Sequence, residues 1–325
     1  MSHAQRGAAL LTVLLLVAVM TTVAVAVLDD VRLSVRRAGN AQAASQARWH
    51  ALAAESAARM RLRAQAAAMP GRTTLAGGWR DAPHRTATPT GWVQVRASDA
   101  AACFNLNAVV EGAGDYLVRR DDGVRQFVAL AVALGIPDAR ARALGDALAD
   151  WIDADADPEP AGVEDAGYAL GAHGRLTGAT LLAEASELRA IAGFDAATYA
   201  RLRPHVCALP VAGGNPINVN TLTLRDWPLL AMASDGAIDR AGAATVIASR
   251  PAAGWASVAD FAATPLLART PPDPAAIAAF DVRTRYVALR VDVLHDGAHL
   301  TMSSLLDVAA DGRTRLLARR WTHDE

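Results

Sequence analysis

The densest group of residues that could carry chemistry is an acidic segment near the middle of the chain. Six carboxylates fall between positions 150 and 165: Asp150, Asp153, Asp155, Asp157, Glu164 and Asp165. Counted from Asp153, acidic residues stand at positions 1, 3, 5 and 12, which is the spacing of an EF-hand calcium loop. Carboxylates this close repel one another unless a cation neutralises them, and hard oxygen ligands suit Ca²⁺. The segment therefore predicts a calcium site.

The same segment departs from a true EF-hand in two respects. Pro158 stands at the sixth position, where an EF-hand needs Gly for its sharp turn. A helix is expected to run into the segment, but no clear helix follows it. The alternative interpretation is an exposed acidic loop that stays solvated and binds no metal.

The two cysteines, Cys103 and Cys207, each lie a few residues before a strand-like segment that contains asparagine. A disulfide between them is chemically permitted if the body of the chain is periplasmic. Two buried free thiols are the alternative.

Catalysis and nucleic-acid binding find little support. The histidines are scattered, and Gly-x-Ser-x-Gly, His-Glu-x-x-His and Gly-rich phosphate loops do not occur. The net charge of −1 gives no electrostatic footprint for nucleic acid. The sequence favours a protein without catalytic activity.

The N-terminus combines a short basic leader with an apolar run. The uncharged run from Ala8 to Leu28 is long enough for a transmembrane helix, and Arg6 places the N-terminus in the cytoplasm. A cleavable junction, Gly7-Ala8, precedes the run, whereas a secretory signal is cut after its apolar core. This arrangement resembles the type IV pilin class, in which a prepilin peptidase cuts before the helix. A plain signal anchor is the alternative.

The elements that position these residues can be read from composition and periodicity. Residues 8–69 favour one long helix, which Pro70-Gly71 ends. Alternating apolar residues predict strands within 91–107 and at 286–295, 298–307 and 314–321, with Asp296-Gly297 and Asp311-Gly312 as turns. Between them we expect helices at 125–134, 139–154, 177–191, 195–202, 224–232, 238–249, 257–263 and 274–280.

Residues 217–263 resemble a SAM-like or helix-hairpin-helix unit, with a turn at Ser234-Asp235-Gly236. Some such units bind DNA, which requires neutralisation of phosphates. Here Arg225, Arg240 and Arg250 are matched by acidic neighbours, namely Asp226, Asp235, Asp239 and Asp260. A structural role in protein contacts is therefore favoured over DNA binding.

Four segments in order carry a more specific resemblance: QRGAALLTVLLLVAV, CFNLNAV, ALADWIDADADPEPAGVEDAGY and INVNTL. Together they resemble the minor pseudopilin K family of the bacterial type II secretion system. The resemblance implies a pilin-like helix and sheet with a large helical domain inserted, and Ca²⁺ bound by acidic residues of the insert. It also implies cleavage between Gly7 and Ala8, N-methylation of Ala8, and a metal site among the six acidic residues.

The expected fold class is therefore α+β, with a long N-terminal helix on a small antiparallel sheet and an all-α insert between the strands. The expected divisions are a leader (1–7), the transmembrane part of the helix (8–28), its periplasmic part (29–70), the first part of the sheet (71–107), a first, calcium-binding SAM-like domain (108–216), a second SAM-like domain (217–282) and the last strands (283–325).

Position five of the mature chain points to a place in the fibre. Pilins normally carry Glu there, which is thought to pair with the N-terminal amine of the subunit above, whereas this chain has Thr12. An unpaired charge in lipid is costly, so Thr12 suits a subunit with nothing above it. A merely lipid-facing Thr12 is the alternative.

The resemblance implies a tip subunit that initiates or caps the pseudopilus. Its partners would be minor pseudopilins I, J and H, the major pseudopilin and the prepilin peptidase, with secreted substrates or the outer-membrane secretin as further contacts. The chain would sit in the inner membrane with a periplasmic body. The alternatives are a minor pilin of a type IV pilus, a signal-anchored periplasmic DNA-binding protein and an anchored periplasmic hydrolase with the acidic cluster as its metal site.

Overall fold

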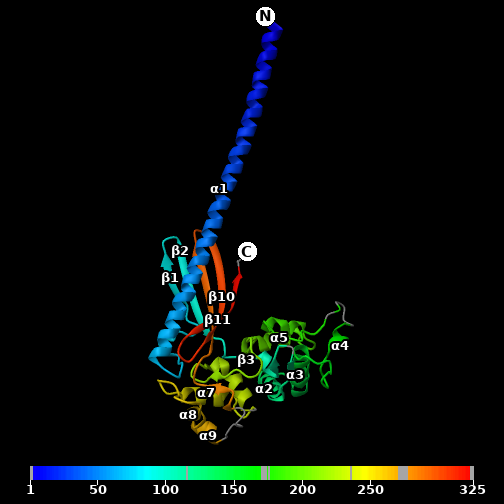
Figure 1. Ribbon diagram of the computed structural model, residues 1–325, viewed down its shortest axis with the longest axis vertical. Helices are drawn as coiled ribbons and strands as arrows, with labels where there is room; N and C mark the ends of the chain where they lie inside the picture. The colour runs from blue at the N-terminus through cyan, green and yellow to red at the C-terminus, as the bar shows by residue number, and fades with distance from the viewer. Residues whose placement is uncertain are drawn as a thin grey trace.

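The computed structural model describes residues 3–114, 116–169, 174, 176–234, 236–269 and 277–322. A long helix, α1 (His3–Ala68), extends far beyond the rest of the molecule (Figure 1). Its second half packs on an antiparallel sheet, and a helical insert lies below the sheet, at the end of the molecule opposite to the N-terminus. This is the expected α+β architecture.

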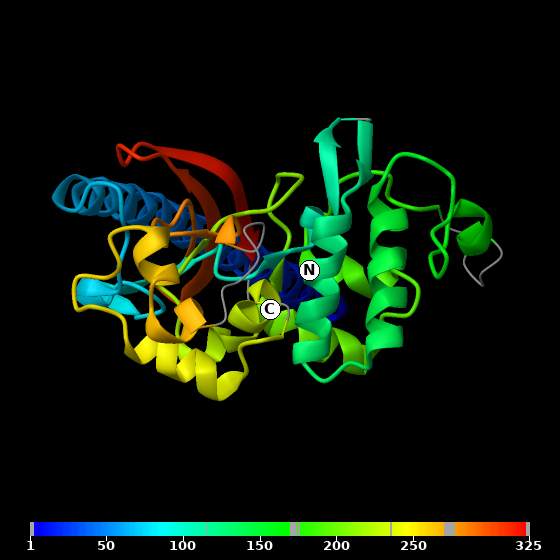
Figure 2. The same cartoon turned by 90° about the horizontal axis from the view of Figure 1, so that it is seen from below.

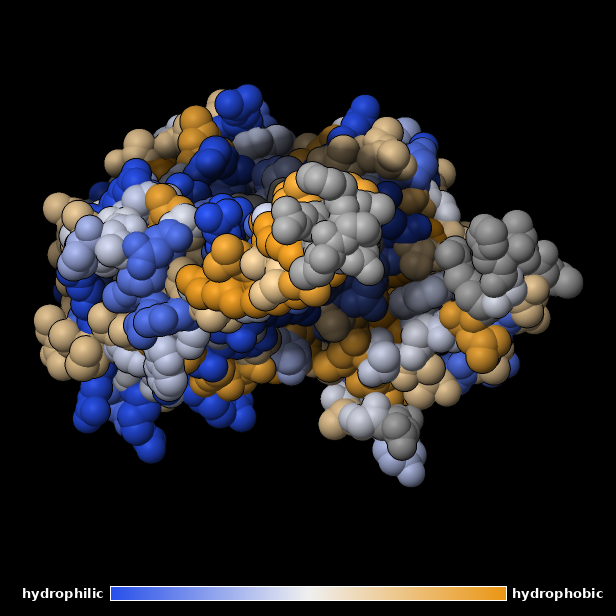
Figure 3. All heavy atoms as spheres, turned by 90° about the horizontal axis from the view of Figure 1, so that it is seen from above, coloured by the Kyte–Doolittle hydropathy of each residue, from blue (hydrophilic) through white to orange (hydrophobic). Residues whose placement is uncertain are grey.

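Helix α1 is continuous through Gly39 because its residues are mostly good helix formers. Its apolar first part, from Leu10 through Leu28, is exposed, as the orange spheres of the protruding helix in Figure 3 show. The helix is long and apolar enough to cross a membrane. Its most apolar window has a mean hydropathy of 2.7, and no part of that window is buried by the described residues.

The sheet joins strands that precede the helical insert in the sequence to strands that follow it. Its order is β1 (His84–Thr88), β2 (Gly91–Asp99), β9 (Tyr286–His295), β10 (Ala298–Val308) and β11 (Thr314–Thr322), with every neighbouring pair antiparallel. The pairing of β2 with β9, in which Val93 lies opposite Val293, joins the two groups of strands. The three C-terminal strands are confirmed, whereas β1 was not predicted because its HRTAT sequence lacks apolar alternation.

Small residues of α1 let the helix approach the sheet closely. Ala47 and Ala51 are fully buried against Val291 and Met302. One turn further on, the buried Glu55 accepts hydrogen bonds from Arg319 Nη2 at 2.8 Å and from Ser304 Oγ at 2.7 Å. This ion pair fixes the position of the helix along β10 and β11.

The Glu55 pair gives a pH-dependent prediction. Burial disfavours the carboxylate, but the hydrogen bonds from Arg319 and Ser304 outweigh it, so the pKa of Glu55 lies below its ordinary value of 4.5. We expect Glu55→Gln to lower the free energy of unfolding by about 1–2 kcal/mol at pH 7. A carboxyl whose pKa is lower in the folded than in the unfolded protein stabilises the fold at pH values above its unfolded pKa. This stabilisation is lost as the pH falls through the pKa of the folded protein. The stability deficit of Glu55→Gln should therefore shrink below pH 4.5.

Urea titrations between pH 3.5 and 7 measure this difference, with the exposed Glu111→Gln as the matched control. A deficit that grows on acidification would contradict the assignment of Glu55 as a stabilising carboxylate.

The insert is built from short helices around one apolar core. The α-helices are α2 (Asp121–Ala133), α3 (Asp138–Ile152), α4 (Asp165–Ala169), α5 (Ala196–Leu202), α6 (Trp227–Ala233), α7 (Arg240–Ala248), α8 (Val258–Ala262) and α9 (Pro265–Arg269). The 3₁₀ turns are η2 (Leu106–Val109), η3 (Ala185–Ala190), η4 (Arg203–His205) and η5 (Leu224–Asp226) in the insert, and η1 (Ala76–Gly78) before it. One cluster of buried residues runs from Phe104 to Val282, so the two expected helical domains share a core. Figure 2 shows the helices of the first half of the insert (green) beside those of the second half (yellow to orange).

The boundary of the insert differs from the expected one. Residues 91–107 do not form strands of one sheet, because β2 ends at Asp99 and β3 (Phe104–Asn105) instead pairs in parallel with β6 (Val206–Cys207). Asn107 shows why: its amide donates to the carbonyls of Leu182 and Leu209, inside the insert. The insert therefore begins before residue 104, not at 108.

Further short strands tie the insert together. β7 (Ile217–Asn218) pairs in parallel with β8 (Phe280–Asp281), and β4 (Val110–Ala113) forms a hairpin with β5 (Tyr116–Arg119). These pairs were not predicted. The helix expected at 274–280 is wrong at its end, because Phe280 is in β8, while Pro274 lies outside the described residues.

The helix expected at 177–191 is also wrong, since only η3 is helical there. The carbonyl of Trp151 accepts hydrogen bonds from the amides of Gly178 and Ala179, at 3.0 and 3.1 Å, and Ala179 has a φ of 42°. Asn107 Oδ1 then accepts from the amide of Leu182 at 2.8 Å. These long-range bonds hold the backbone in an extended path that local propensity cannot reveal.

Candidate functional site

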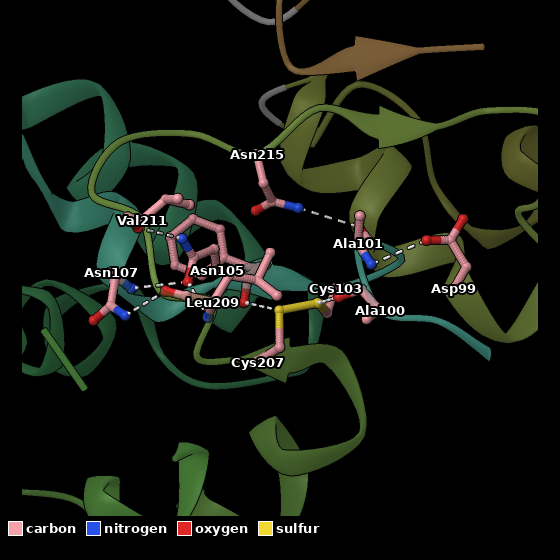
Figure 4. The surroundings of a disulfide bond; sticks show 11 residues. Asp99, Ala100, Ala101, Cys103, Asn105, Asn107, Cys207, Leu209, Val211 and Asn215 are labelled. Atoms are coloured by element: carbon pink, nitrogen blue, oxygen red, sulfur yellow. Dashed lines mark hydrogen bonds between the residues drawn. A yellow bond between two sulfur atoms is a disulfide. The ribbon is translucent and has the colours of Figure 1, made fainter. Parts of the chain in front are cut away.

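The two cysteines join the entry and exit of the first half of the insert. Cys103 and Cys207 form a disulfide across the β3–β6 pair, with a sequence separation of 104. Figure 4 shows Asn105 and Asn107 beside this bond. Asn105 Oδ1 accepts from the amide of Leu209 at 2.9 Å, and its amide donates to the carbonyl of Val211. The disulfide and the two asparagines thus hold the same junction.

Three of the six predicted acidic residues come together at the end of α3. Asp153 is the C-cap of that helix, Asp155 follows it in the loop, and Glu164 immediately precedes α4. One carboxylate oxygen from each lies within 4.8 Å of the others. Calcium takes oxygen ligands at about 2.3–2.6 Å, so oxygens around one ion stand at such separations.

Burial and mutual repulsion disfavour the charged form of the carboxylates in this cluster. Asp153 is 4% exposed and Glu164 8%. Asp153 Oδ1 and Glu164 Oε1 are buried without a hydrogen-bond partner among the described residues. Burial, reinforced by the neighbouring carboxylates, raises the pKa of Asp153 to about 7 and that of Glu164 to about 7. Buried polar groups are normally hydrogen-bonded, and a bound cation would satisfy both oxygens.

The other three predicted ligands take different places. Asp150 is buried beside the cluster, where burial raises its pKa to about 6 and where it accepts a hydrogen bond from the amide of Glu159 at 3.2 Å. Asp157 is exposed and contributes only its amide, which donates to Asp155 Oδ1. Asp165 accepts from the amide and hydroxyl of Thr177 at 2.7 and 2.8 Å, and this holds the pKa of its carboxyl low. Asp165 therefore fixes the loop.

Residues that the sequence analysis missed hold the loop in place. The amide of Ala154 donates to the carbonyl of Leu117 in β5, and Arg119 on the same strand pairs with Asp146 at 3.1 Å and Glu159 at 3.5 Å. Gly162 lies against Asp150: a Cβ there would stand 1.8 Å from Asp150 Oδ2. The sequence Pro160-Ala161-Gly162 indicates a turn at Gly162, but it does not show that this glycine lies against Asp150.

A buried polar junction connects the sheet to the second half of the insert. Asp99, at the end of β2, accepts hydrogen bonds from the hydroxyls of Thr221 and Thr284 at 2.6 and 2.7 Å, and burial raises its pKa. Arg80 pairs with Asp226 at 3.0 Å. These contacts fix the position of the insert relative to the sheet.

Arg250 bears on the DNA-binding alternative. Its guanidinium donates to the main-chain carbonyls of Asn220, at 2.9 Å, and Leu222, and burial lowers its pKa. It therefore holds the INVNTL segment and is not directed at a phosphate backbone. Asp235, in the predicted hairpin turn, lies outside the described residues.

The predicted processing residues lie far from the acidic cluster. Gly7 and Ala8 are part of α1, and Thr12 is on its exposed first part. The structure thus separates a protruding apolar helix from a body that carries the acidic site.

Comparison with known proteins matches both halves of the insert. Two family models described as type II secretion system (T2SS), protein K, match residues 102–211 and 217–283. These two segments cover more than half of the chain. The chain belongs to the type II secretion system protein K family. Its role is that of a minor pseudopilin in type II secretion.

Relatives extend the match beyond the insert. Type II secretion system protein K of Klebsiella pneumoniae is 36% identical over 83% of this chain and 82% of its own length. That of Pectobacterium carotovorum is 35% identical, with 82% of both chains covered. The Pseudomonas aeruginosa protein is 32% identical and covers 98% of this chain and 93% of its own.

A solved structure shares the fold. The crystal structure of the GspK–GspI–GspJ complex from the type 2 secretion system of enterotoxigenic Escherichia coli matches with a TM-score of 0.76 at 31% identity. The match covers 89% of this chain and all of that one. The expectation of a protein K pseudopilin fold is confirmed.

Proposed function

We propose that this chain is the tip subunit of the pseudopilus, where it initiates or caps the fibre without catalytic activity of its own. The observation that supports this proposal is the position of the helical insert in the molecule. It lies at the far end of the molecule from the apolar half of α1 (Figure 1). With α1 anchored in the inner membrane, the insert projects into the periplasm, where it obstructs any subunit stacked above.

Thr12 supports the same placement. Helix α1 exposes its apolar first part, so position five of the mature chain faces lipid or neighbouring helices. A carboxylate there would cost on the order of 2.5–3.5 kcal/mol without an amine to meet it. A subunit with nothing above it avoids this cost by having a hydroxyl.

Minor pseudopilins I and J are the proposed first neighbours of this chain, because the homologous GspK is found in a GspK–GspI–GspJ complex. Pseudopilin H and the major pseudopilin would follow. The contacts would use the exposed face of α1, which carries Trp49 and Met60, at 65% and 68% exposure. Secreted substrates or the secretin would meet the insert.

We further propose that Asp153, Asp155 and Glu164 bind Ca²⁺, with Asp150 next to the ion. The support is the convergence of three carboxylates and the two buried oxygens that have no partner in the described part of the chain. The ion would be structural, since it would fix the loop between α3 and α4. The all-oxygen donor set suits a hard cation.

Processing at the N-terminus tests membership of the pilin class. The chain isolated from membranes is expected to begin at Ala8, with one added methyl group, only in cells that contain the prepilin peptidase. Gly7→Val should block cleavage because the junction then lacks its small residue, whereas the control Ala9→Val, beyond the junction, should still be cut. Intact-mass measurement distinguishes these products. A chain that still begins at Met1, or is cut after Leu28, would contradict processing of this kind.

A further inference from the structure

A cavity of about 320 Å³ lies between the end of α1 and the lower end of the sheet. Its walls come from the last turns of α1, from residues 71–79 and from β9 and β10 (the region where α1 ends in Figure 1). Ligand cavities in proteins begin near 300 Å³. A cavity of about 150 Å³ is known to hold benzene, so this one has room for roughly a dozen carbon atoms.

The body of the cavity is apolar and needs no polar ligand. Leu62, Met69, Val287 and Val308 contribute aliphatic walls. Trp79 adds an aromatic wall, and its indole N–H already donates to the carbonyl of Thr74 at 2.7 Å. An apolar group would therefore displace water from these walls without leaving a polar atom unpaired.

The polar side of the cavity is cationic. Arg72 and Arg283 line it, and none of the described residues around it is acidic. Within the part of the chain that the structure describes, Nη1 of Arg283 is buried and has no hydrogen-bond partner. The hydroxyl of Thr284 is already used, since it donates to Asp99. Arg283 thus lines the cavity and pairs with no carboxylate in the described part of the chain. A planar guanidinium matches a carboxylate in two-pronged geometry.

We propose that this cavity binds a small amphipathic carboxylate, with its aliphatic chain against Met69 and Trp79 and its carboxylate on Arg283. The proposal goes beyond the pseudopilus assignment and does not depend on it. Apolar walls supply affinity in proportion to the area that they cover. The cationic side, which Arg72 and Arg283 line, selects an anion over a neutral or cationic molecule of the same length.

The test is calorimetric titration of the full-length chain in lipid nanodiscs with octanoate, after subtraction of the same titration into empty nanodiscs. Saturable binding with one site is expected for octanoate. Octanamide and octylamine, which have the same chain length without the anion, should bind about tenfold more weakly or worse. Absence of saturable heat, or equal binding of the three compounds, would overturn the proposal.

Three variants locate the site. Arg283→Gln should weaken octanoate about tenfold, whereas Arg240→Gln, an exposed arginine on α7, should leave binding unchanged. Ala309→Phe, at an exposed position on the rim, should block the cavity and abolish binding without unfolding the chain. Circular dichroism establishes that each variant is folded. Unchanged octanoate binding in folded Arg283→Gln and Ala309→Phe would place the ligand elsewhere and refute the assignment.

Discussion

Removal of calcium is expected to lower the free energy of unfolding of the body by about 3 kcal/mol, or roughly 5–10 °C in melting temperature. Asp153 and Glu164 each bury an oxygen that has no protein partner among the described residues, and Asp155 adds a third negative charge within 4.8 Å. Without a cation these carboxylates repel one another. Differential scanning calorimetry of the full-length chain in 1 mM Ca²⁺ and in EGTA measures the effect.

Two variants separate a metal site from a merely acidic loop. Asp153→Asn should no longer respond to Ca²⁺, and in EGTA it should be at least as stable as the parent because one repelling charge has gone. Asp157→Asn, at an exposed position outside the cluster, should retain the full response to Ca²⁺. Equal melting temperatures of the parent in Ca²⁺ and EGTA would rule out a structural calcium ion.

Loss of the disulfide is expected to have the other large effect. The bond between Cys103 and Cys207 closes a loop with a sequence separation of 104, which holds α2, α3, the acidic loop and α5. Closing a loop of about a hundred residues stabilises by about 4–5 kcal/mol in the chain-entropy model. The double variant Cys103→Ala and Cys207→Ala should therefore lose about that free energy of unfolding in urea titrations.

Reduction of the disulfide in the parent chain controls for effects of the two cysteine-to-alanine substitutions themselves. The parent in dithiothreitol should match the double variant, because the two proteins then differ only in two sulfur atoms. A loss below about 1 kcal/mol in both would mean that the β3–β6 pair and the Asn107 bonds hold the junction without the covalent link.

The parts of the fold that the sequence predicted well are those with a strong local period. Helix α1 and strands β9, β10 and β11 carry unbroken apolar patterns or clear turn residues, such as Asp296-Gly297. The segment 177–191 was mistaken for a helix because its Leu and Ala content favours one. Its path is set instead by Trp151 and Asn107, which are distant in sequence. Local patterns contain no information about such partners.

The candidate site shows the same division. The count of carboxylates predicted a cluster, but not which of them would meet. Asp165 bonds Thr177 because the extended segment passes beside α4, and Asp157 is carried outward by the loop. The boundary of the insert was missed for a related reason: Phe104 and Asn105 look like sheet residues, yet they pair with β6, which lies about a hundred residues later.

The position of this chain on the assembled fibre tests the central claim most directly. Pseudopili formed under overproduction of the major pseudopilin can be labelled with gold-conjugated antibody against the insert, with antibody against the major pseudopilin as the control for labelling along the fibre. A tip subunit predicts gold at one end only, and no label on fibres from cells that lack the chain. Gold distributed along the fibres, or absent from both ends, would contradict the proposed role.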